Sequence, residues 1–299
     1  MISVIICTYN RAKYIIKALD CLFDTTYKQY EVLVVDNNST DNTSELLKAY
    51  IADNSSLPIK YYLETKQGLS NARNRGIAEA KGDILIFLDD DALVCPNYLN
   101  IVDEYLQKYP NIDAFGGKII PIFDECDAPK WLCKWSESWV SGLNLGAKVC
   151  SFPTKIFPIG ANMGFRKSVF DICGLFDPNL GRSAGNLIGG EEKDLFNRMY
   201  SHGMTILYLP NAVAEHVIPP KRTTIEYVCN FGLGVGISER IRTKANKTFG
   251  KRLFLELVKW GGTLVLALLN VLKLRFVCGT TLVRFRYNVT KGLLRRIEH

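Results

Sequence analysis

The chain has 299 residues, of which 47% are hydrophobic and 22% charged, so its composition is typical of a globular protein and excludes a disordered one. This length allows one large α/β domain with an appendage, or two small domains. The 9 cysteines include no Cys-x-x-Cys pair, which favours reduced thiols in a cytoplasmic protein. The N-terminus MISVIICTYN has no basic segment, so no signal peptide is expected.

The net charge of +7 is unevenly distributed along the chain. Residues 239–299 contain 14 Lys/Arg and 3 Asp/Glu, whereas the residues before them contain 23 Lys/Arg and 27 Asp/Glu. A mildly acidic body therefore carries a basic C-terminal region. Nucleic acid and an anionic membrane surface are the usual partners of such a region, and its apolar content distinguishes the two.

The first hundred residues alternate between apolar runs typical of buried strands and amphipathic segments typical of helices. The apolar runs predict strands at 2–9, 30–39, 59–64 and 83–91, and the segments between them predict helices at 12–24, 41–53 and 69–81. This alternation predicts right-handed βαβ units and a parallel sheet. Ligands of such a sheet bind beyond the carboxyl ends of its strands.

Polar residues follow three of these strands, at the edge where a ligand is expected: Thr8, Tyr9, Asn10, Asp36, Asn37, Asn38, Asp89, Asp90 and Asp91. The chain lacks both G-x-G-x-x-G and G-x-x-x-x-G-K-[ST] after its first strand, which excludes the two common phosphate-binding glycine loops. Carboxylates repel a bare phosphate, but they suit a Mg²⁺ or Mn²⁺ ion placed between the protein and a diphosphate. For three aspartates alone, an acidic surface turn is an equally good interpretation.

With its neighbouring motifs, the sequence resembles the family 2 glycosyltransferases, which have the GT-A fold, from Ile2 to about Arg242. Seven segments occur in the family's order: VIICTYNRAKYI, VLVVDNNSTDNT, KQGLSNARNRGI, FLDDDALV, GANMGFRKSVF, GGEEKDLFNRM and AEHVIPP. The resemblance implies a Rossmann-like nucleotide-binding sheet flanked by helices. It also implies an inverting, metal-dependent transfer of a sugar from a nucleotide-sugar donor.

The resemblance further implies roles for the acidic residues. Asp36 corresponds to the residue that accepts the uracil N3–H. Asp91 corresponds to the direct ligand of Mn²⁺ or Mg²⁺, with Asp89 near the ribose and metal and His216 as a further metal ligand. Asp90, in the middle of the DxD motif, is expected to be structural or to support the residues that contact the ligand. A histidine with no such context is more often not a ligand.

The residues expected to bind the nucleotide sugar lie on the same edge: Thr8, Tyr9, Asn10, Arg11, Asp36, Asn38, Gly68, Asn71, Arg73, Asp89 and Asp90. Arg73 lies on the helix whose start, KQGLSNAR, faces this edge, and it is expected to neutralise phosphate or grip the base. A surface ion pair is the alternative for Arg73.

The segment GGEEKDLFNRM offers the catalytic base, with Glu192 at the family's position and Glu191 as the alternate. Its two glycines allow close approach of a ligand, and a helix is expected to start at the glutamates. Two acidic residues favoured by a helix dipole are the alternative interpretation. The preceding loop, 181–190, is expected to become ordered when a substrate binds.

Trp131, Trp135 and Trp139 recur at helical spacing. They predict either stacking on a sugar or lipid, or a packed core stripe.

An apolar segment flanked by cations follows at 251–276. Its uncharged part, Trp260–Leu272, has 13 residues, whereas a spanning helix needs about 20. The segment therefore predicts a helix in the membrane interface or a shallow re-entrant hairpin at Gly261–Gly262. A buried helix hairpin with a solvated basic face is the alternative. Nucleic-acid binding is disfavoured because large aliphatic residues alternate with the basic ones.

These observations predict a GT-A domain over 1–242, with a nucleotide-sugar half (1–95) and an acceptor and base half (96–242), and a membrane-associating region over 243–299. The expected donor is a UDP-sugar, and the expected acceptor is a glycan or polyprenyl-linked glycan in cell-surface synthesis. The expected location is the inner face of the cytoplasmic membrane. A catalytically inactive nucleotide-sugar-binding partner and a nucleotidyltransferase are the alternatives.

Overall fold

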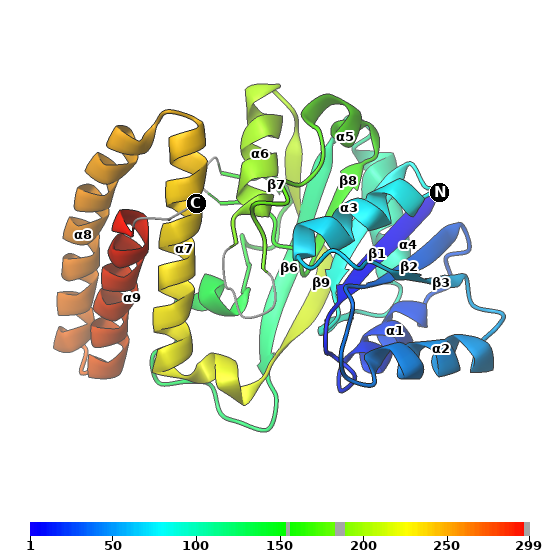
Figure 1. Ribbon diagram of the computed structural model, residues 1–299, viewed down its shortest axis with the longest axis horizontal. Helices are drawn as coiled ribbons and strands as arrows, with labels where there is room; N and C mark the ends of the chain where they lie inside the picture. Colours follow the sequence, from blue (N-terminus) through cyan, green and yellow to red (C-terminus); the bar gives the residue numbers. More distant parts are fainter. Residues whose placement is uncertain (154–155, 183–188, 296–299) are drawn as a thin grey trace. The chain divides into compact units, whose positions relative to one another are not determined.

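The computed structural model describes residues 1–153, 156–182 and 189–295 (Figure 1). Strands and helices alternate at the start of the chain as predicted: β1 (Ile2–Thr8), α1 (Ile15–Phe23), β2 (Tyr30–Asp36), α2 (Thr43–Asp53), β3 (Ile59–Leu63), α3 (Leu69–Glu79) and β4 (Ile84–Asp89). The predicted parallel pairing is confirmed, because β1 pairs in parallel with β2 and β4, and β2 with β3.

Antiparallel strands extend the same sheet. The elements that follow are β5 (Ala92–Val94), α4 (Tyr98–Lys108), β6 (Ala114–Phe123), η1 (Glu137–Val140), β7 (Cys150–Ser151), β8 (Met163–Arg166), α5 (Ser168–Cys173), α6 (Glu191–Ser201) and β9 (Ile206–Ile218). In the described part of the chain the strand order is β3-β2-β1-β4-β8-β6-β9-β5, and β7 pairs with β9. The predicted α/β class is therefore confirmed, with a mixed sheet in place of a purely parallel one.

The central strands are mostly apolar because they are covered on both faces. Val4, Ile5 and Val34 have no exposed surface. Helix α3 packs directly on β1 through Gly76, where a Cβ atom would lie 2.4 Å from Cγ2 of Ile5. Glycine at this position lets the helix, and the residues at its start, approach the sheet closely.

The strand register sets the positions of the polar residues at the sheet edge. In the parallel pairs, Thr8 lies opposite Asp36, and Cys7 lies opposite Asp89. In the antiparallel pair of β5 with β9, Ala92 lies opposite His216. Segments more than a hundred residues apart in the sequence are thereby brought to the same edge.

The chain divides into two compact units by packing. The first, called the sheet unit, comprises residues 1–122, 141–179 and 191–217. The second, called the helical unit, comprises residues 123–140, 180–190 and 218–299. The domain division at residue 242 remains a prediction, as does the division at residue 95. Residue 242 lies within a helix of the helical unit.

The helical unit contains η2 (Pro220–Thr223) and three longer helices, α7 (Ile225–Ala245), α8 (Phe249–Leu272) and α9 (Phe276–Leu294). The re-entrant hairpin considered at Gly261–Gly262 does not form, because α8 runs through both glycines without a break. The chain reverses after α8 instead, where Leu274 has a φ of 57°. Among the described residues, α8 is the one helix that is long and apolar enough to span a membrane.

The three regularly spaced tryptophans do not form one helical stripe. Trp131 and Trp139 are buried and pack with Val228, Cys278 and Leu282 of the helical unit. Trp135 is exposed, and only Glu137–Val140 of this segment is helical, as a short 3₁₀ turn. The packed-core interpretation is therefore correct for two of the three side chains.

Candidate functional site

The end of β2 carries a buried carboxylate whose surroundings fix its orientation. Asp36 Oδ1 accepts a hydrogen bond from the backbone N–H of Ser39 (2.9 Å), and Oδ2 accepts one from the Tyr61 hydroxyl (2.8 Å). Each carboxylate oxygen has a second lone pair, so Asp36 can accept a further donor from a ligand. Tyr61 was not anticipated from the sequence, although its strand, β3, neighbours β2 in the sheet.

The turns after β1 and β2 are joined by Asn10. Its Oδ1 accepts hydrogen bonds from the backbone N–H groups of Thr40 (2.7 Å) and Asp41 (3.2 Å). Asn10 and Asn38 both adopt left-handed backbone conformations, with φ of 54° and 62°. Asparagine tolerates this conformation better than most residues. The structure therefore gives Asn10, an expected nucleotide contact, a clear role in shaping the turns.

The start of α3 is tied to the same edge. The N–H of Gly68 donates to Oδ1 of Asn37 (2.8 Å), and Gly68 has a φ of 130° that only glycine adopts easily. Asn71 Nδ2 donates to the backbone carbonyl of Gln67 (3.0 Å). Of the other predicted residues, Thr8 is buried and Tyr9 is half-buried at the end of β1.

A carboxylate–imidazole cluster lies at the ends of β4 and β9. One ligand atom from each of Asp89, Asp91 and His216 lies within 4.8 Å of the others. His216 Nε2 is 3.0 Å from Asp91 Oδ1 and 3.7 Å from Asp89 Oδ2. Asp91 and His216 are buried, whereas the Asp89 side chain is 34% exposed. Two carboxylate oxygens and an imidazole nitrogen, open on one side, fit a Mn²⁺ or Mg²⁺ ion that also binds a ligand.

Arg11 balances part of the negative charge of this cluster. Its Nη2 is 3.1 Å from Asp91 Oδ2, and its Nε is 3.5 Å from Asp90 Oδ1. Burial raises the pKa of Asp90 to about 7, although the Arg11 guanidinium opposes that shift. Arg11 was expected to contact the nucleotide, and its position beside two carboxylates was not predictable from sequence spacing.

Arg73 joins α3 to the start of α6. Its Nη1 donates to Glu191 Oε1 (3.0 Å), and its Nη2 donates to Glu192 Oε1 (2.9 Å). The N–H of Gly160 also donates to Glu192 Oε1 (2.8 Å). A Cβ at residue 160 would lie 2.0 Å from Nη2 of Arg73, so this contact requires glycine. The guanidinium is almost fully buried and lies over the ring of Phe176.

The two glutamates differ in their access to a ligand. Glu191 has a side chain that is 5% exposed, whereas that of Glu192 is 23% exposed. Burial raises the pKa of Glu192 to about 7, and the Arg73 guanidinium acts against that rise. A carboxylate with a pKa near neutrality can both accept and release a proton at physiological pH. This geometry favours Glu192 over Glu191 as the group that reaches a substrate.

Residues 3–173 match the sequence profile described as "Glycosyl transferase family 2". The chain belongs to glycosyl transferase family 2. This family 2 protein is 31% identical over 108 residues to glycosyltransferase GlyG of Streptococcus pneumoniae, and the match covers 36% of each chain. It is 23% identical to the glucosyl-dolichyl phosphate glucuronosyltransferase of Haloferax volcanii, over 80% of this chain and 76% of that protein. The chain thus spans about a third of one of these relatives and three quarters of the other.

Solved structures of glycosyltransferases share the fold. The mannosyltransferase PcManGT of Pyrobaculum calidifontis, in complex with GDP-Man and Mn²⁺, aligns with a TM-score of 0.64 and 18% identity over 98% of this chain and 87% of that one. GalNAc-T7 with UDP, GalNAc and Mn²⁺ aligns with a TM-score of 0.58 and 19% identity, over 79% of this chain and 48% of that one. The predicted GT-A fold is confirmed.

The structure brings together most of the residues predicted for the site in this family 2 protein, and all of those described belong to the sheet unit. Reasoning from the sequence missed Gly160, although it lies in the segment GANMGF, which carried the resemblance. Residues 183–188 of the loop expected to become ordered lie outside the described residues.

Proposed function

We propose that this protein is an inverting, metal-dependent glycosyltransferase that moves a sugar from a nucleotide-sugar donor to an acceptor hydroxyl. The observation that carries the proposal is the presence of two distinct charged sites in one unit. One is the open cluster of Asp89, Asp91 and His216, and the other is the partly buried pair of Arg73 with Glu192. A nucleotide-binding protein without activity needs no carboxylate with a pKa raised to about 7.

On the donor side, Asp89, Asp91 and His216 would hold the cation. When bound, a divalent ion stabilises the negative charge that develops on a departing diphosphate. Asp36 is available to accept the N3–H of uracil, which supports UDP as the nucleotide. Arg11 lies beside the carboxylates of Asp90 and Asp91 and reduces their repulsion of a diphosphate.

On the acceptor side, Glu192 removes the proton of the acceptor hydroxyl. The hydroxyl oxygen then forms a bond to the anomeric carbon, while the bond from that carbon to the diphosphate oxygen breaks and its electron pair leaves with the nucleotide. A single displacement of this kind inverts the anomeric configuration. Arg73 and the N–H of Gly160 hold one oxygen of Glu192, so the side chain has a fixed orientation for this step.

The acceptor we propose is a glycan or polyprenyl-linked glycan used in cell-surface synthesis, at the inner face of the cytoplasmic membrane. Two observations support this assignment. The Haloferax volcanii relative has a name that specifies a dolichyl phosphate-linked substrate. The C-terminal helices of this protein carry exposed apolar side chains and an excess of basic residues.

A donor screen tests the proposed activity. UDP- and GDP-sugars are assayed with Mn²⁺ for hydrolysis and for their effect on the melting temperature. We expect UDP-sugars to raise the melting temperature in the presence of Mn²⁺ and to be hydrolysed slowly with water as acceptor. Stabilisation by GDP-sugars alone would contradict the assignment of Asp36, and no response to either donor would contradict the proposed function.

A further inference from the structure

Helix α8 has its polar and apolar faces reversed relative to a helix of a water-soluble bundle. The face that packs within the helical unit carries Arg252, Glu256, Thr263 and Asn270, all of them buried. The opposite face carries exposed apolar side chains: Phe254, Leu257, Val258, Leu264, Val265, Leu268, Leu269 and Leu272. Leu257 and Leu272 are each 71% exposed.

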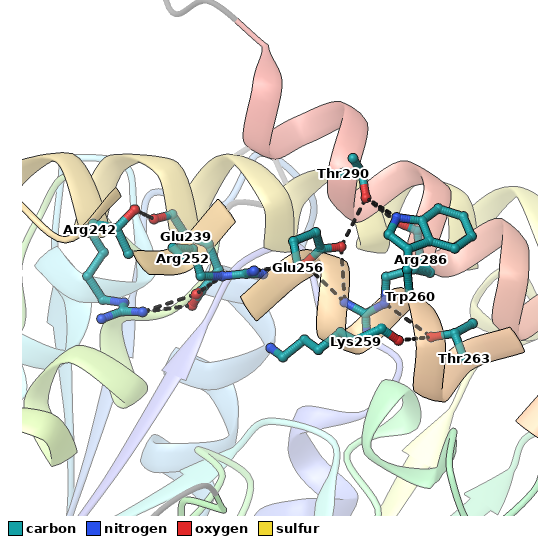
Figure 2. Close-up of polar contacts among 10 residues, drawn as sticks. Glu239, Arg242, Arg252, Glu256, Lys259, Trp260, Thr263, Arg286 and Thr290 are labelled. Carbon is teal, nitrogen blue, oxygen red and sulfur yellow. Dashed lines mark hydrogen bonds and ion pairs between the residues drawn. The ribbon is translucent and has the colours of Figure 1, made fainter. Parts of the chain in front are cut away.

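The packed face is held by a continuous set of ion pairs and hydrogen bonds, shown in Figure 2. Arg252 Nε donates to Glu239 Oε2 of α7 (2.7 Å), and its Nη1 donates to Glu256 Oε2 (2.7 Å). Glu256 Oε1 also accepts from Arg286 (3.3 Å) and from the Thr290 hydroxyl (2.9 Å), both on α9. Arg242 also donates hydrogen bonds to Glu239. We call these residues together the interhelical ion network.

The interhelical ion network determines how α8 can meet its surroundings. Separating α8 from α7 and α9 at a membrane would break the pairs with Glu239 and Arg286 and place unpaired charges in lipid, which is strongly unfavourable. Helix α8 therefore stays in the bundle, and only its outer face is available to a partner. Glu256 is the one acidic residue of α8 and it is buried, so this outer face presents no negative charge.

Helices α7 and α9 pack closely through glycines. A Cβ at Gly236 would lie 2.1 Å from the carbonyl oxygen of Val289, and one at Gly292 would lie 2.2 Å from that of Leu233. The two backbones are therefore in direct contact. Small residues between helices, polar groups paired inside and apolar side chains outside together form the pattern of helices that contact lipid.

The bundle is not arranged to span a bilayer. α8 is long enough and apolar enough to do so, but its partner α9 exposes Arg284 near its middle and Lys291 in its last turn. A spanning bundle would place these cations in the hydrocarbon layer, where exposed charges are unfavourable. In a helix that lies along the surface, the same cations remain in contact with water or lipid headgroups.

We infer that the outer face of α8 inserts sideways into the interface of a bilayer that contains anionic lipid. Its apolar side chains extend from Phe254 to Leu272, about 27 Å at 1.5 Å per residue. The exposed Lys251 and Lys273 lie at the two ends of this face, where they can contact lipid phosphates. The inference rests on the proposed membrane location and assigns its contact surface to one helix face.

Flotation with vesicles tests this inference on the full chain. We expect the wild-type protein to float with vesicles of phosphatidylcholine and phosphatidylglycerol, and to bind less, but measurably, at high salt. The double variant Leu264→Asp/Leu268→Asp should lower vesicle binding by about tenfold or more, because two charges enter the apolar face. The control Ile172→Asp/Leu175→Asp adds the same charges to exposed apolar positions of the sheet unit and should float normally.

A folding control and two further measurements complete the test, and either of the two measurements can overturn the inference. Melting curves check that both double variants remain folded, since all four positions are exposed. Protein that resists extraction from vesicles with alkaline carbonate would show a spanning helix. A dimer in solution that dissociates in Leu264→Asp/Leu268→Asp, without flotation of the wild type, would show that a second copy covers this face.

Catalysis and vesicle binding are measured separately. Glu192→Gln should float like the wild type, so loss of transfer in that variant bears only on the proposed function. Normal flotation of Leu264→Asp/Leu268→Asp would contradict the inference even if the enzyme is active.

Discussion

The interhelical ion network of the helical unit and the candidate site of the sheet unit both bury charged side chains, but the hydrogen-bonding groups of those side chains are satisfied to different degrees. In the helical unit, all four oxygens of Glu239 and Glu256 accept hydrogen bonds from arginine or threonine. In the sheet unit, His216 Nδ1 and Glu191 Oε2 are buried atoms without a hydrogen-bond partner in the described part of the chain. Complete satisfaction indicates a structural role, whereas spare bonding capacity at a strand edge indicates a site for a ligand.

The apolar side chains of the two units also differ. Those of the sheet unit are buried on both faces of the central strands, while the helical unit exposes those on the outer face of α8. Folding of the first unit is thus driven by burial of its own core. The second unit keeps its helices together partly through charge, and leaves apolar surface for a partner.

Removing a predicted metal ligand should have the largest effect on activity. Asp91→Asn keeps the shape of the side chain but removes the charge that attracts the cation, so transfer should fall by about 10³-fold or more. Steady-state kinetics with Mn²⁺ measure the loss. Asp83→Asn, which changes a highly exposed carboxylate, is the matched control and should keep full activity. Normal turnover in Asp91→Asn would refute the metal site.

Removing the proposed base should cost about 10²–10⁴-fold in rate, the usual contribution of a general base. Glu192→Gln keeps the hydrogen bonds to one oxygen and loses the capacity to take a proton. Single-turnover transfer assays measure the rate. The paired variant is Glu191→Gln, whose side chain is less exposed. A near-normal Glu192→Gln beside an inactive Glu191→Gln would assign the base to the neighbouring residue.

Breaking the interhelical ion network should destabilise the helical unit. Glu256→Ala removes the carboxylate to which both Arg252 and Arg286 donate. The buried arginines then lack this partner, so the free energy of unfolding should fall by about 3–5 kcal/mol. The comparison is Glu79→Ala, which removes a half-exposed pair with Arg75 and should cost less than about 1 kcal/mol. Chemical denaturation measures the free energy of unfolding of both variants. An equally small loss of stability in Glu256→Ala and Glu79→Ala would show that the network is not structurally important.

The pH dependence of transfer should report on Arg73. Glu192 must be ionised to accept a proton and its pKa is raised to about 7, so the rate should rise with pH through that region. The Arg73 guanidinium lowers this pKa, and Arg73→Lys replaces two fixed hydrogen bonds by a mobile charge. The midpoint of the pH–rate profile should therefore move to higher pH in this variant. An unchanged midpoint would show that Arg73 does not influence the base.

Much of the fold and of the site could be predicted because the signals are local. The alternation of apolar runs located β1 to β4 and the helices between them, and short motifs identified Asp36, the three aspartates, the glutamates and His216. Parallel strands end at one edge, so the polar residues that follow them had to lie together.

Contacts between distant segments could not be predicted in this way. The partners of Arg73 lie 118 and 119 residues further along the chain, and no pattern within the α3 segment indicates them. The same holds for α8: two adjacent glycines suggested a break, but packing against α9 keeps the helix continuous. Tertiary contacts override a local propensity of about 1 kcal/mol per glycine.

Calorimetric titration of UDP in the presence of Mn²⁺ tests most directly the claim that the two charged sites of the sheet unit have separate tasks. The account predicts that Asp91→Asn loses Mn²⁺-dependent UDP binding, whereas Glu192→Gln binds UDP as tightly as the wild type while its transfer rate falls. Equal loss of binding in both variants, or full binding in Asp91→Asn, would contradict it.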